Sequence, residues 1–219
     1  MTAPDVREAL RYLGAANPPP DLLRQAQQVA DGLSAAVQPR YAYRAYPVEL
    51  SGDRVRLPGA GVELAGASAR RMLAQCNQAV LLACTLGSRF DALLLAAQAR
   101  DMARAVLLDA LGSALVEAGC DAAQAEIAAR FPGKYLTDRF SPGYGDLPLD
   151  AQPGICAALD AGRRMGLTVT QSLLMNPVKS VTAVIGLSCT PQPARIRGCR
   201  FCILQDTCLF RKEGTHCGV

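Results

Sequence analysis

The sequence has 219 residues, of which 50% are hydrophobic and 19% are charged, and this composition excludes an intrinsically disordered chain. Its length predicts one globular domain, with room for a small appendage. No apolar run reaches the roughly 20 residues that a membrane-spanning helix needs, and the charged N-terminal segment does not resemble a signal peptide, so we expect a soluble, cytoplasmic protein. The net charge is only +4 and there is no tryptophan, which argues against nucleic-acid binding.

The first 40 residues predict two helices, at 4–14 and 21–37, which are separated by the prolines of 18–20. Asp21 follows those prolines and is the expected N-cap of the second helix. After this segment the pattern changes to strands and turns. The elements expected there are a strand at 41–50, a turn at 51–53, a strand at 54–57, a helix at 67–75 and a buried strand at 80–86.

The stretch from 88 to about 131 is rich in alanine and leucine and has no proline, so it predicts two or three helices. Gly119 and Asp121 are the expected C-cap and N-cap between two of them. The elements expected after it are a loop that contains Pro142 and Pro148, a helix at 151–165, and two strands within 167–187 that turn at Asn176-Pro177. This mixture of helices, strands and hairpins predicts an α+β fold.

The last part of the chain differs in composition and carries four of the nine cysteines. We therefore expect an N-terminal helical segment at 1–40, a main domain at 41–190 and a cysteine-rich tail at 191–219. The four cysteines of the tail are Cys199, Cys202, Cys208 and Cys217.

The spacing Cys-x2-Cys presents two thiolates from one turn, as a tetrahedral soft metal requires, and two further cysteines complete four sulfur ligands. The tail thus predicts an iron–sulfur cluster or a zinc site, with His216 or Cys189 as alternative ligands. A redox dithiol or reduced structural cysteines are the competing interpretations, and disulfides are not expected in a reducing compartment. The other five cysteines lie in apolar contexts and are interpreted as packing residues.

A second motif is Arg139, followed by a Gly-rich turn at Gly143 and Tyr144. An arginine can bind a carboxylate bidentately, and glycine lets a ligand approach the backbone, although Ser-Pro-Gly is also an ordinary turn. His216 is the single histidine, which excludes a histidine-dependent catalytic triad in the main domain. The usual nucleotide-binding loops are absent, so any catalysis would depend on bound cofactors.

The ordered set of motifs between 137 and 187 resembles the activation domain of cobalamin-dependent methionine synthase. The matching residues are Arg139-x-x-x-Gly143-Tyr144, Leu147-Pro148, Gly166-Leu-Thr-Val-Thr170-Gln-Ser172-Leu-Leu-Met175-x-Pro177 and Ser180-Val181-Thr-Ala. The upstream segment and the Cys-x2-Cys tail resemble free-standing members of that family. The resemblance implies helices packed on a mostly antiparallel twisted sheet, with a short cysteine-rich tail.

The resemblance also implies a function, which is to bind S-adenosylmethionine and to support reductive methylation of cob(II)alamin. Carried over to this chain, it implies that Arg139 contacts the ligand carboxylate and that Ser141, Gly143 and Tyr144 lie along the ligand. Glu117 is the best match for an acidic side chain that binds the ligand in the family, and Asp109 lies on a nearby helical face.

The implied partner is a separate cobalamin-dependent methionine synthase or another corrinoid protein. This chain lacks the cobalamin-binding motif of the full-length methionine synthases, which are called the long enzymes below. That partner would supply the cobalamin, and an electron donor is also required. The Gly145-Asp146 sequence departs from the Pro-Ala of the long enzymes. Two alternatives stay open: a non-catalytic docking or assembly protein, and a redox-responsive accessory protein.

Overall fold

The computed structural model describes residues 2–15, 17–192 and 206. Its helices are α1 (Val6–Tyr12), α2 (Pro20–Ala36), α3 (Ala67–Leu73), α4 (Ser88–Gln98), α5 (Met102–Arg130), α6 (Ala151–Ala158) and α7 (Ala161–Met165). Its strands are β1 (Arg40–Pro47), β2 (Glu49–Ser51), β3 (Arg54–Leu57), β4 (Val62–Leu64), β5 (Cys76–Thr85), β6 (Tyr135–Leu136), β7 (Thr168–Val169), β8 (Met175–Asn176) and β9 (Ser180–Ser188). None of the helices in the described ranges is long and apolar enough to cross a membrane.

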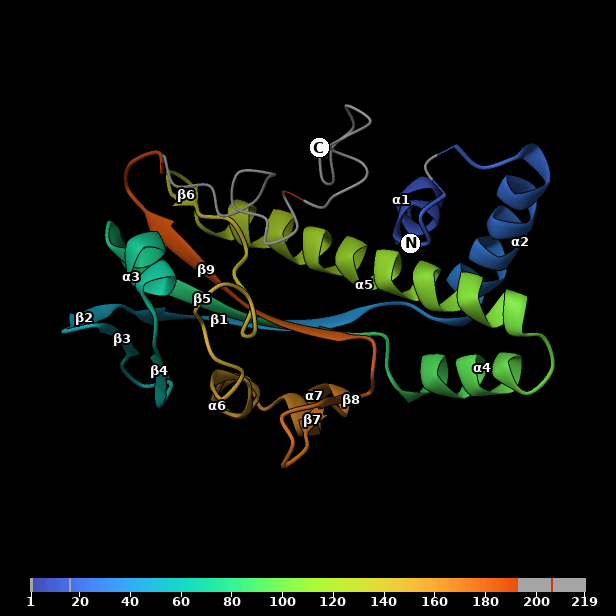
Figure 1. The fold of residues 1–219 in the computed structure, drawn as a ribbon. Coiled ribbons are helices and arrows are strands. Elements are labelled where there is room, and N and C mark those ends of the chain that lie inside the picture. The colour runs from blue at the N-terminus through green and yellow to red at the C-terminus, as the bar shows by residue number, and fades with distance from the viewer. Residues whose placement is uncertain (1, 16, 193–205, 207–219) are drawn as a thin grey trace.

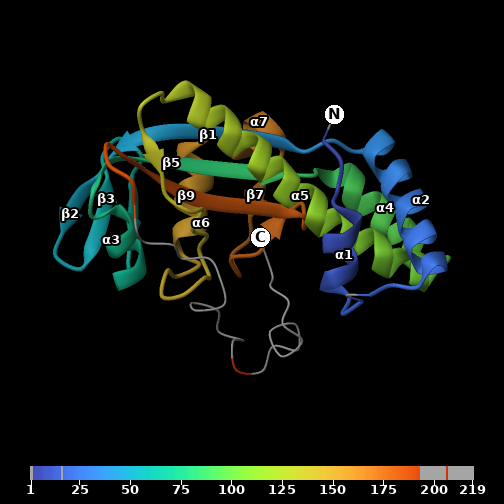
Figure 2. The same ribbon diagram turned by 90° about the horizontal axis from the view of Figure 1, so that it is seen from above.

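The central sheet is antiparallel and has the strand order β1-β5-β9-β6. Figure 2 shows β1, β5 and β9 side by side beneath the long helix α5. The two inner strands are apolar on both faces, as expected for strands covered from both sides. Two small sheets, β2-β3-β4 and β7-β8, complete the strands.

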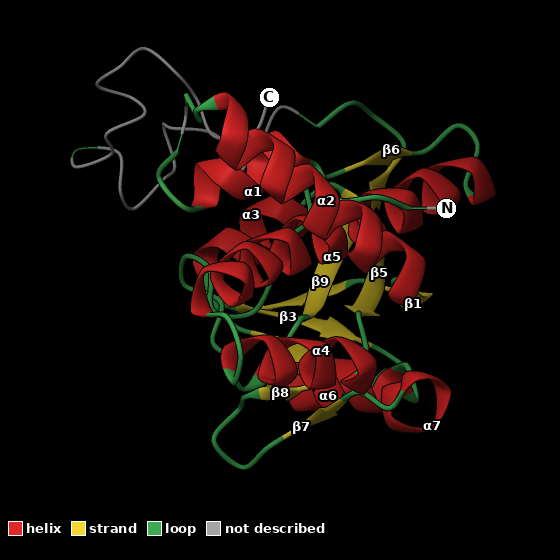
Figure 3. Cartoon of the chain, turned by 90° about the vertical axis from the view of Figure 1, so that its right-hand side faces the viewer, coloured by secondary structure: helices red, strands yellow, loops and turns green. Residues whose placement is uncertain are grey.

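Helices cover both faces of this sheet (Figures 1 and 3). Side chains of β5 alternate between the faces: Leu82 joins the core under α1, α2, α4 and α5, whereas Leu81 joins the core lined by α3, α6 and α7. The α+β class and the mostly antiparallel sheet are therefore confirmed, and the helices at the N-terminus share a core with α5.

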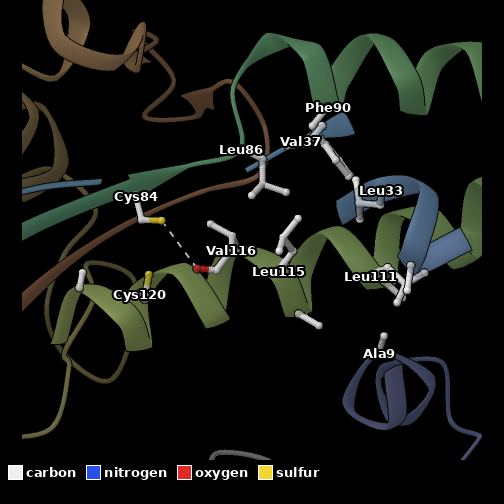
Figure 4. Close-up of a cluster of buried hydrophobic side chains, with 14 of the residues drawn as sticks. Ala9, Leu33, Val37, Cys84, Leu86, Phe90, Leu111, Leu115, Val116 and Cys120 are labelled. Carbon is white, nitrogen blue, oxygen red and sulfur yellow. Dashed lines mark hydrogen bonds between the residues drawn. The ribbon is translucent and has the colours of Figure 1, made fainter. Parts of the chain in front are cut away.

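α5 is one continuous helix of 29 residues, so the expected break at Gly119 and Asp121 is wrong. A Cβ atom on Gly119 would lie 2.5 Å from Cβ of Pro39 and 2.9 Å from Sγ of Cys84. Gly119 therefore permits a close approach between the helix and the sheet and does not end the helix. Figure 4 shows this packed interface, in which the Cys84 thiol donates to the carbonyl of Val116 at 3.7 Å.

Two other expected helix boundaries differ from the structure. The helix expected at 151–165 is divided into α6 and α7, because Asp160 has a left-handed backbone with φ of 52°. α2 begins at Pro20, and Asp21 lies in its first turn rather than at the N-cap, because a proline at the first helical position has no N–H to be satisfied.

The strands also include elements that the sequence patterns did not indicate. Within 167–187 the structure has a short β7-β8 hairpin, then the turn at Asn176-Pro177, then β9. Two short strands, β4 and β6, were not expected, since runs of two or three residues carry little periodicity. β6 matters for the site, because it leads directly into the segment that carries Arg139.

Two polar contacts hold α5 over the sheet. Near its C-terminal end, the hydroxyls of Tyr41 and Tyr43 on β1 each donate to a carboxylate oxygen of Glu126 at 2.8 Å. Toward its N-terminal end, the ammonium of Lys179 lies 3.0 Å from a carboxylate oxygen of Asp109.

Candidate ligand site around Arg139

Arg139 is positioned by its neighbour Phe140, which forms an isolated bridge with Val184 on β9. The N–H of Phe140 donates to the carbonyl of Val184 at 3.0 Å, and the N–H of Val184 donates back at 2.8 Å. Phe140 is buried in the core on the α6 side of the sheet. Because successive side chains of an extended segment alternate, Arg139 points to the opposite face, toward α5.

The guanidinium of Arg139 contacts three side chains of α5, at positions that share one helical face. Its Nη2 donates to Glu117 at 2.8 Å, and its Nη1 donates to Asp121 at 2.5 Å and to Gln124 at 3.2 Å. The Arg139 side chain is only 4% exposed.

Burial alone would lower the pKa of Arg139, since it penalises the charged form. The hydrogen bond that Arg139 donates to Asp121 and the electrostatic interactions with Cys120, Asp121 and Glu117 outweigh burial and raise that pKa above its ordinary value. Arg139 therefore stays a cation throughout the pH range in which proteins fold.

The structure brings Glu117 and Arg139 together, as the resemblance implies for two residues of one site. Asp109, the other acidic residue considered, instead pairs with Lys179 and lies twelve residues from Asp121 on the same helix. Sequence reasoning missed Asp121 and Gln124 as neighbours of Arg139. The spacing of 117, 121 and 124 places these residues on one face of a continuous helix, and it could have indicated them. The expected helix break at Asp121 hid this pattern, because it interrupts the helix between them.

Gly143 and Tyr144 form a tight turn that begins at Ser141. The N–H of Tyr144 donates to the carbonyl of Ser141 at 3.1 Å, and the N–H of Gly143 donates to the carbonyl of Leu147 at 2.8 Å. Gly143 has φ of +89°, which a side chain would strain. Ser141 is half-buried, whereas Tyr144 is 71% exposed, so its aromatic ring is accessible at the surface.

Asp146, the residue that departs from the long enzymes, has a structural role. Its carboxylate accepts the backbone N–H of Ser68 at 3.1 and 3.2 Å, at the start of α3. A Cβ on Gly66 would lie 2.5 Å from the carbonyl oxygen of Asp146, so only glycine fits there. Burial raises the pKa of Asp146, but the hydrogen bonds from Ser68 and Ala67 lower it overall. Asp146 thus ties the Tyr144 turn to α3.

α1 lies near the acidic residue Glu117 of α5. The pKa of Tyr12 is raised mainly by burial, then by a hydrogen bond with Glu8, and further by the negative charge of Glu117. Tyr12 is 43% exposed, so it is a second aromatic ring near Glu117 with an accessible surface. The sequence patterns gave no indication of this proximity, because α1 and α5 are far apart in the chain.

The five cysteines between 41 and 190 pack as expected, with one exception. Cys76, Cys84, Cys120 and Cys156 are buried. Cys189 is exposed, and the ammonium of Lys134 donates to its sulfur at 3.0 Å, so the packing interpretation is wrong for this residue, which lies just beyond the end of β9.

The predicted metal ligands of the tail lie outside the described residues. These are Cys199, Cys202, Cys208 and Cys217, together with the alternative His216. Within the part of the chain that the structure describes, no three cysteine, histidine, aspartate or glutamate side chains are grouped to hold a metal ion.

Two hollows of the described surface lie away from Arg139. One, of about 530 Å³, follows the outer edge of β1 and is lined by residues that include Arg44, Arg130 and Arg164. The other, of about 270 Å³, lies between α6, α7 and β7. Neither hollow is lined by Arg139 or Tyr144. Tyr144 is highly exposed, so it lies on an open part of the surface and not in an enclosed pocket.

Comparison with known proteins yields a structural relative. No family model and no curated protein matches this sequence. Among solved structures, the chain is similar to one described as the crystal structure of the MetH reactivation domain bound to AdoHcy. The TM-score is 0.65 at 17% sequence identity, over 96% of this chain and 83% of that chain. This likeness shows a shared fold.

Proposed function

We propose that this chain binds S-adenosylmethionine at the surface around Arg139 and acts as a reactivation subunit for a cobalamin-dependent methyltransferase. One observation carries the proposal: Arg139, Glu117 and the Gly143-Tyr144 turn lie together on a reactivation-domain fold. The similar solved structure is of a domain bound to AdoHcy, which is the demethylated counterpart of S-adenosylmethionine.

The side chains match the chemistry of such a ligand. A guanidinium forms strong, charge-assisted hydrogen bonds with carboxylates, which suits Arg139 for the ligand carboxylate. The carboxylate of Glu117, half-exposed beside it, suits the ligand ammonium. The exposed ring of Tyr144 offers an apolar face on which the ligand can pack, and the half-buried Ser141 adds a hydroxyl.

The reaction needs no nucleophile from this chain. The bound ligand supplies a methyl group, and the cobalamin of a partner accepts it together with one electron from a donor. The part played by the chain is to hold the methyl donor in a fixed orientation, with its charges neutralised by Arg139 and Glu117. The proposed partner is a cobalamin-dependent methionine synthase or another corrinoid protein.

Calorimetric titration with AdoHcy and S-adenosylmethionine tests the proposal. We expect saturable 1:1 binding, and at least about tenfold weaker binding for Arg139→Ala, because the charge-assisted hydrogen bonds to the ligand carboxylate are lost. Arg104→Ala is the matched control, since Arg104 is an exposed arginine in the first turn of α5. Titrations that show no binding, alone and with the corrinoid partner present, would contradict the proposal.

A second candidate is a docking or assembly protein that has kept the fold but not the ligand. It is favoured by the contacts of Arg139, all three of which go to α5, so that the arginine also serves to attach the 137–149 segment to the helix. Under this function, Arg139→Ala lowers thermal stability, and wild-type protein binds the partner whether or not AdoHcy is present. The same titrations and a partner-binding assay separate the two candidates.

A further inference from the structure

The cation at the candidate site is already neutralised from within the chain. Arg139 carries one positive charge, and it contacts the carboxylates of both Glu117 and Asp121. A ligand carboxylate that approaches Arg139 therefore meets a group of net negative charge. Unless one internal carboxylate moves away, electrostatic repulsion opposes the contact on which the proposed function depends.

The two sides of this cluster differ in their freedom to move. The Arg139 side chain is 4% exposed and held by the bridge at Phe140, so it is fixed in place. The Asp121 side chain is 68% exposed, compared with 43% for Glu117. Asp121 can rotate into water at low cost, because most of its side chain is already exposed and exposed ion pairs contribute little to stability.

The contacts on the guanidinium also identify Asp121 as the group that leaves. Asp121 and Gln124 both accept hydrogen bonds from Nη1, whereas Glu117 accepts one from Nη2. If Asp121 departs, Gln124 still supports Nη1 and Glu117 still fixes the orientation of the plane. One strong donor position is then open for an incoming carboxylate, and Glu117 remains for the ligand ammonium.

We propose that Asp121 is a latch: in the free protein it occupies the position on Arg139 that the ligand carboxylate takes, and binding displaces it into solvent. This inference rests on the proposed function and concerns the regulation of the same site. The latch keeps a buried cation paired when no ligand is present. It also lowers the apparent affinity for any ligand that must compete with it.

The test compares two ligands and two positions. The ligands are AdoHcy and its decarboxylated analogue, which keeps the amine and the thioether but has no carboxylate. The variant is Asp121→Asn, with Asp121→Ser as a second variant in case the first folds poorly. Asp109→Asn is the matched control, because Asp109 is an aspartate of the same helix that pairs with a different cation, Lys179.

We expect Asp121→Asn to tighten AdoHcy binding by roughly three- to tenfold, since a neutral amide competes more weakly for Arg139. Binding of the decarboxylated analogue changes by less than about twofold in the same variant, and Asp109→Asn leaves both dissociation constants unchanged. Thermal unfolding of each variant verifies that it is folded.

The outcomes separate this inference from the function on which it rests. If wild-type protein binds AdoHcy and Asp121→Asn binds it equally or more weakly, the latch is wrong and the function stands. An equal gain for both ligands also overturns the latch, because the effect would not depend on the carboxylate. If AdoHcy binds to neither protein, the proposed function fails and the latch fails with it. Binding to the variant alone supports both.

Discussion

Asp146 illustrates how one carboxylate connects the candidate site to the rest of the fold. It departs from the long enzymes in the sequence motif, and in the structure it accepts the N–H of Ser68 at the start of α3. A carboxylate at a helix N-terminus satisfies a backbone donor that has no partner within the helix and interacts favourably with the helix dipole. Asp146 therefore holds the Tyr144 turn against the start of α3.

We expect Asp146→Asn to lower the free energy of unfolding by about 0.3–1 kcal/mol at pH 7, the usual contribution of a negative charge at a helix N-terminus. Because folding lowers the pKa of Asp146, its contribution is present above the ordinary value of about 3.9 and is lost as the pH falls through the lower folded-state pKa. Urea unfolding at pH 7 and near pH 2 measures the difference.

The control for this prediction is Asp150→Asn. Asp150 stands at the N-cap of α6 but makes no capping hydrogen bond with its side chain. It should change stability at pH 7 by less than Asp146→Asn does. A difference between wild type and Asp146→Asn that persists at acid pH would argue against the capping role.

α5 organises the molecule at the scale of elements, because it contacts helices on one side and presents the acidic residues of the site on another. Its glycines mark the places where other elements come close. A Cβ on Gly112 would lie 2.2 Å from Cζ of Phe90, whose side chain is completely buried on α4. Gly112 and Gly119 therefore sit inside a helix because of packing, in spite of their poor helix propensity.

We expect Gly112→Ala to destabilise the protein by about 2–3 kcal/mol, because the added methyl group overpacks the contact between α4 and α5. Helix propensity alone predicts the opposite sign, a gain of about 1 kcal/mol. Chemical denaturation measures the change, and a simultaneous Phe90→Leu substitution should recover part of the loss.

Gly32→Ala in α2 is the control, since no atom lies within 4 Å of the added Cβ. It should stabilise the protein by about 0.5–1 kcal/mol. If Gly112→Ala were as stable as Gly32→Ala, the close contact with Phe90 would not exist in solution.

At the scale of the whole molecule, two cores lie on opposite faces of one sheet. The candidate ligand site is built at the β6 edge of that sheet, from α5 and the segment after β6. All of its predicted residues lie between 117 and 144. The cysteine tail is therefore expected to serve a separate purpose, and the iron–sulfur or zinc site stays a prediction from the sequence.

Deletion of 195–219 tests this separation. We expect the truncated protein to bind AdoHcy with an unchanged dissociation constant and to lose the metal that the full chain carries. Anaerobic purification followed by iron, sulfide and zinc analysis identifies that metal. Zinc without iron would overturn an electron-transfer role for the tail, and loss of ligand binding on truncation would favour an accessory protein that depends on it.

The sequence by itself determined the features that depend on local patterns. Apolar periodicity and alternation were sufficient for most helices, for the buried strand at 80–86 and for the α+β class, because these patterns repeat over a few residues. The motif around Arg139 was also recognisable, whereas Glu117 was named only because the family resemblance implies an acidic residue at the ligand. Short strands such as β6 and the left-handed Asp160 left no such pattern.

Only the tertiary structure decided what the residues between these patterns do. Gly119 and Asp121 look like a helix break in sequence, yet one admits Pro39 and the other binds Arg139. Asp146 finds its partner 78 residues away, at Ser68. Such roles depend on which distant segments the sheet brings into contact. These long-range contacts depend on how both cores pack, so they cannot be predicted from a local sequence pattern.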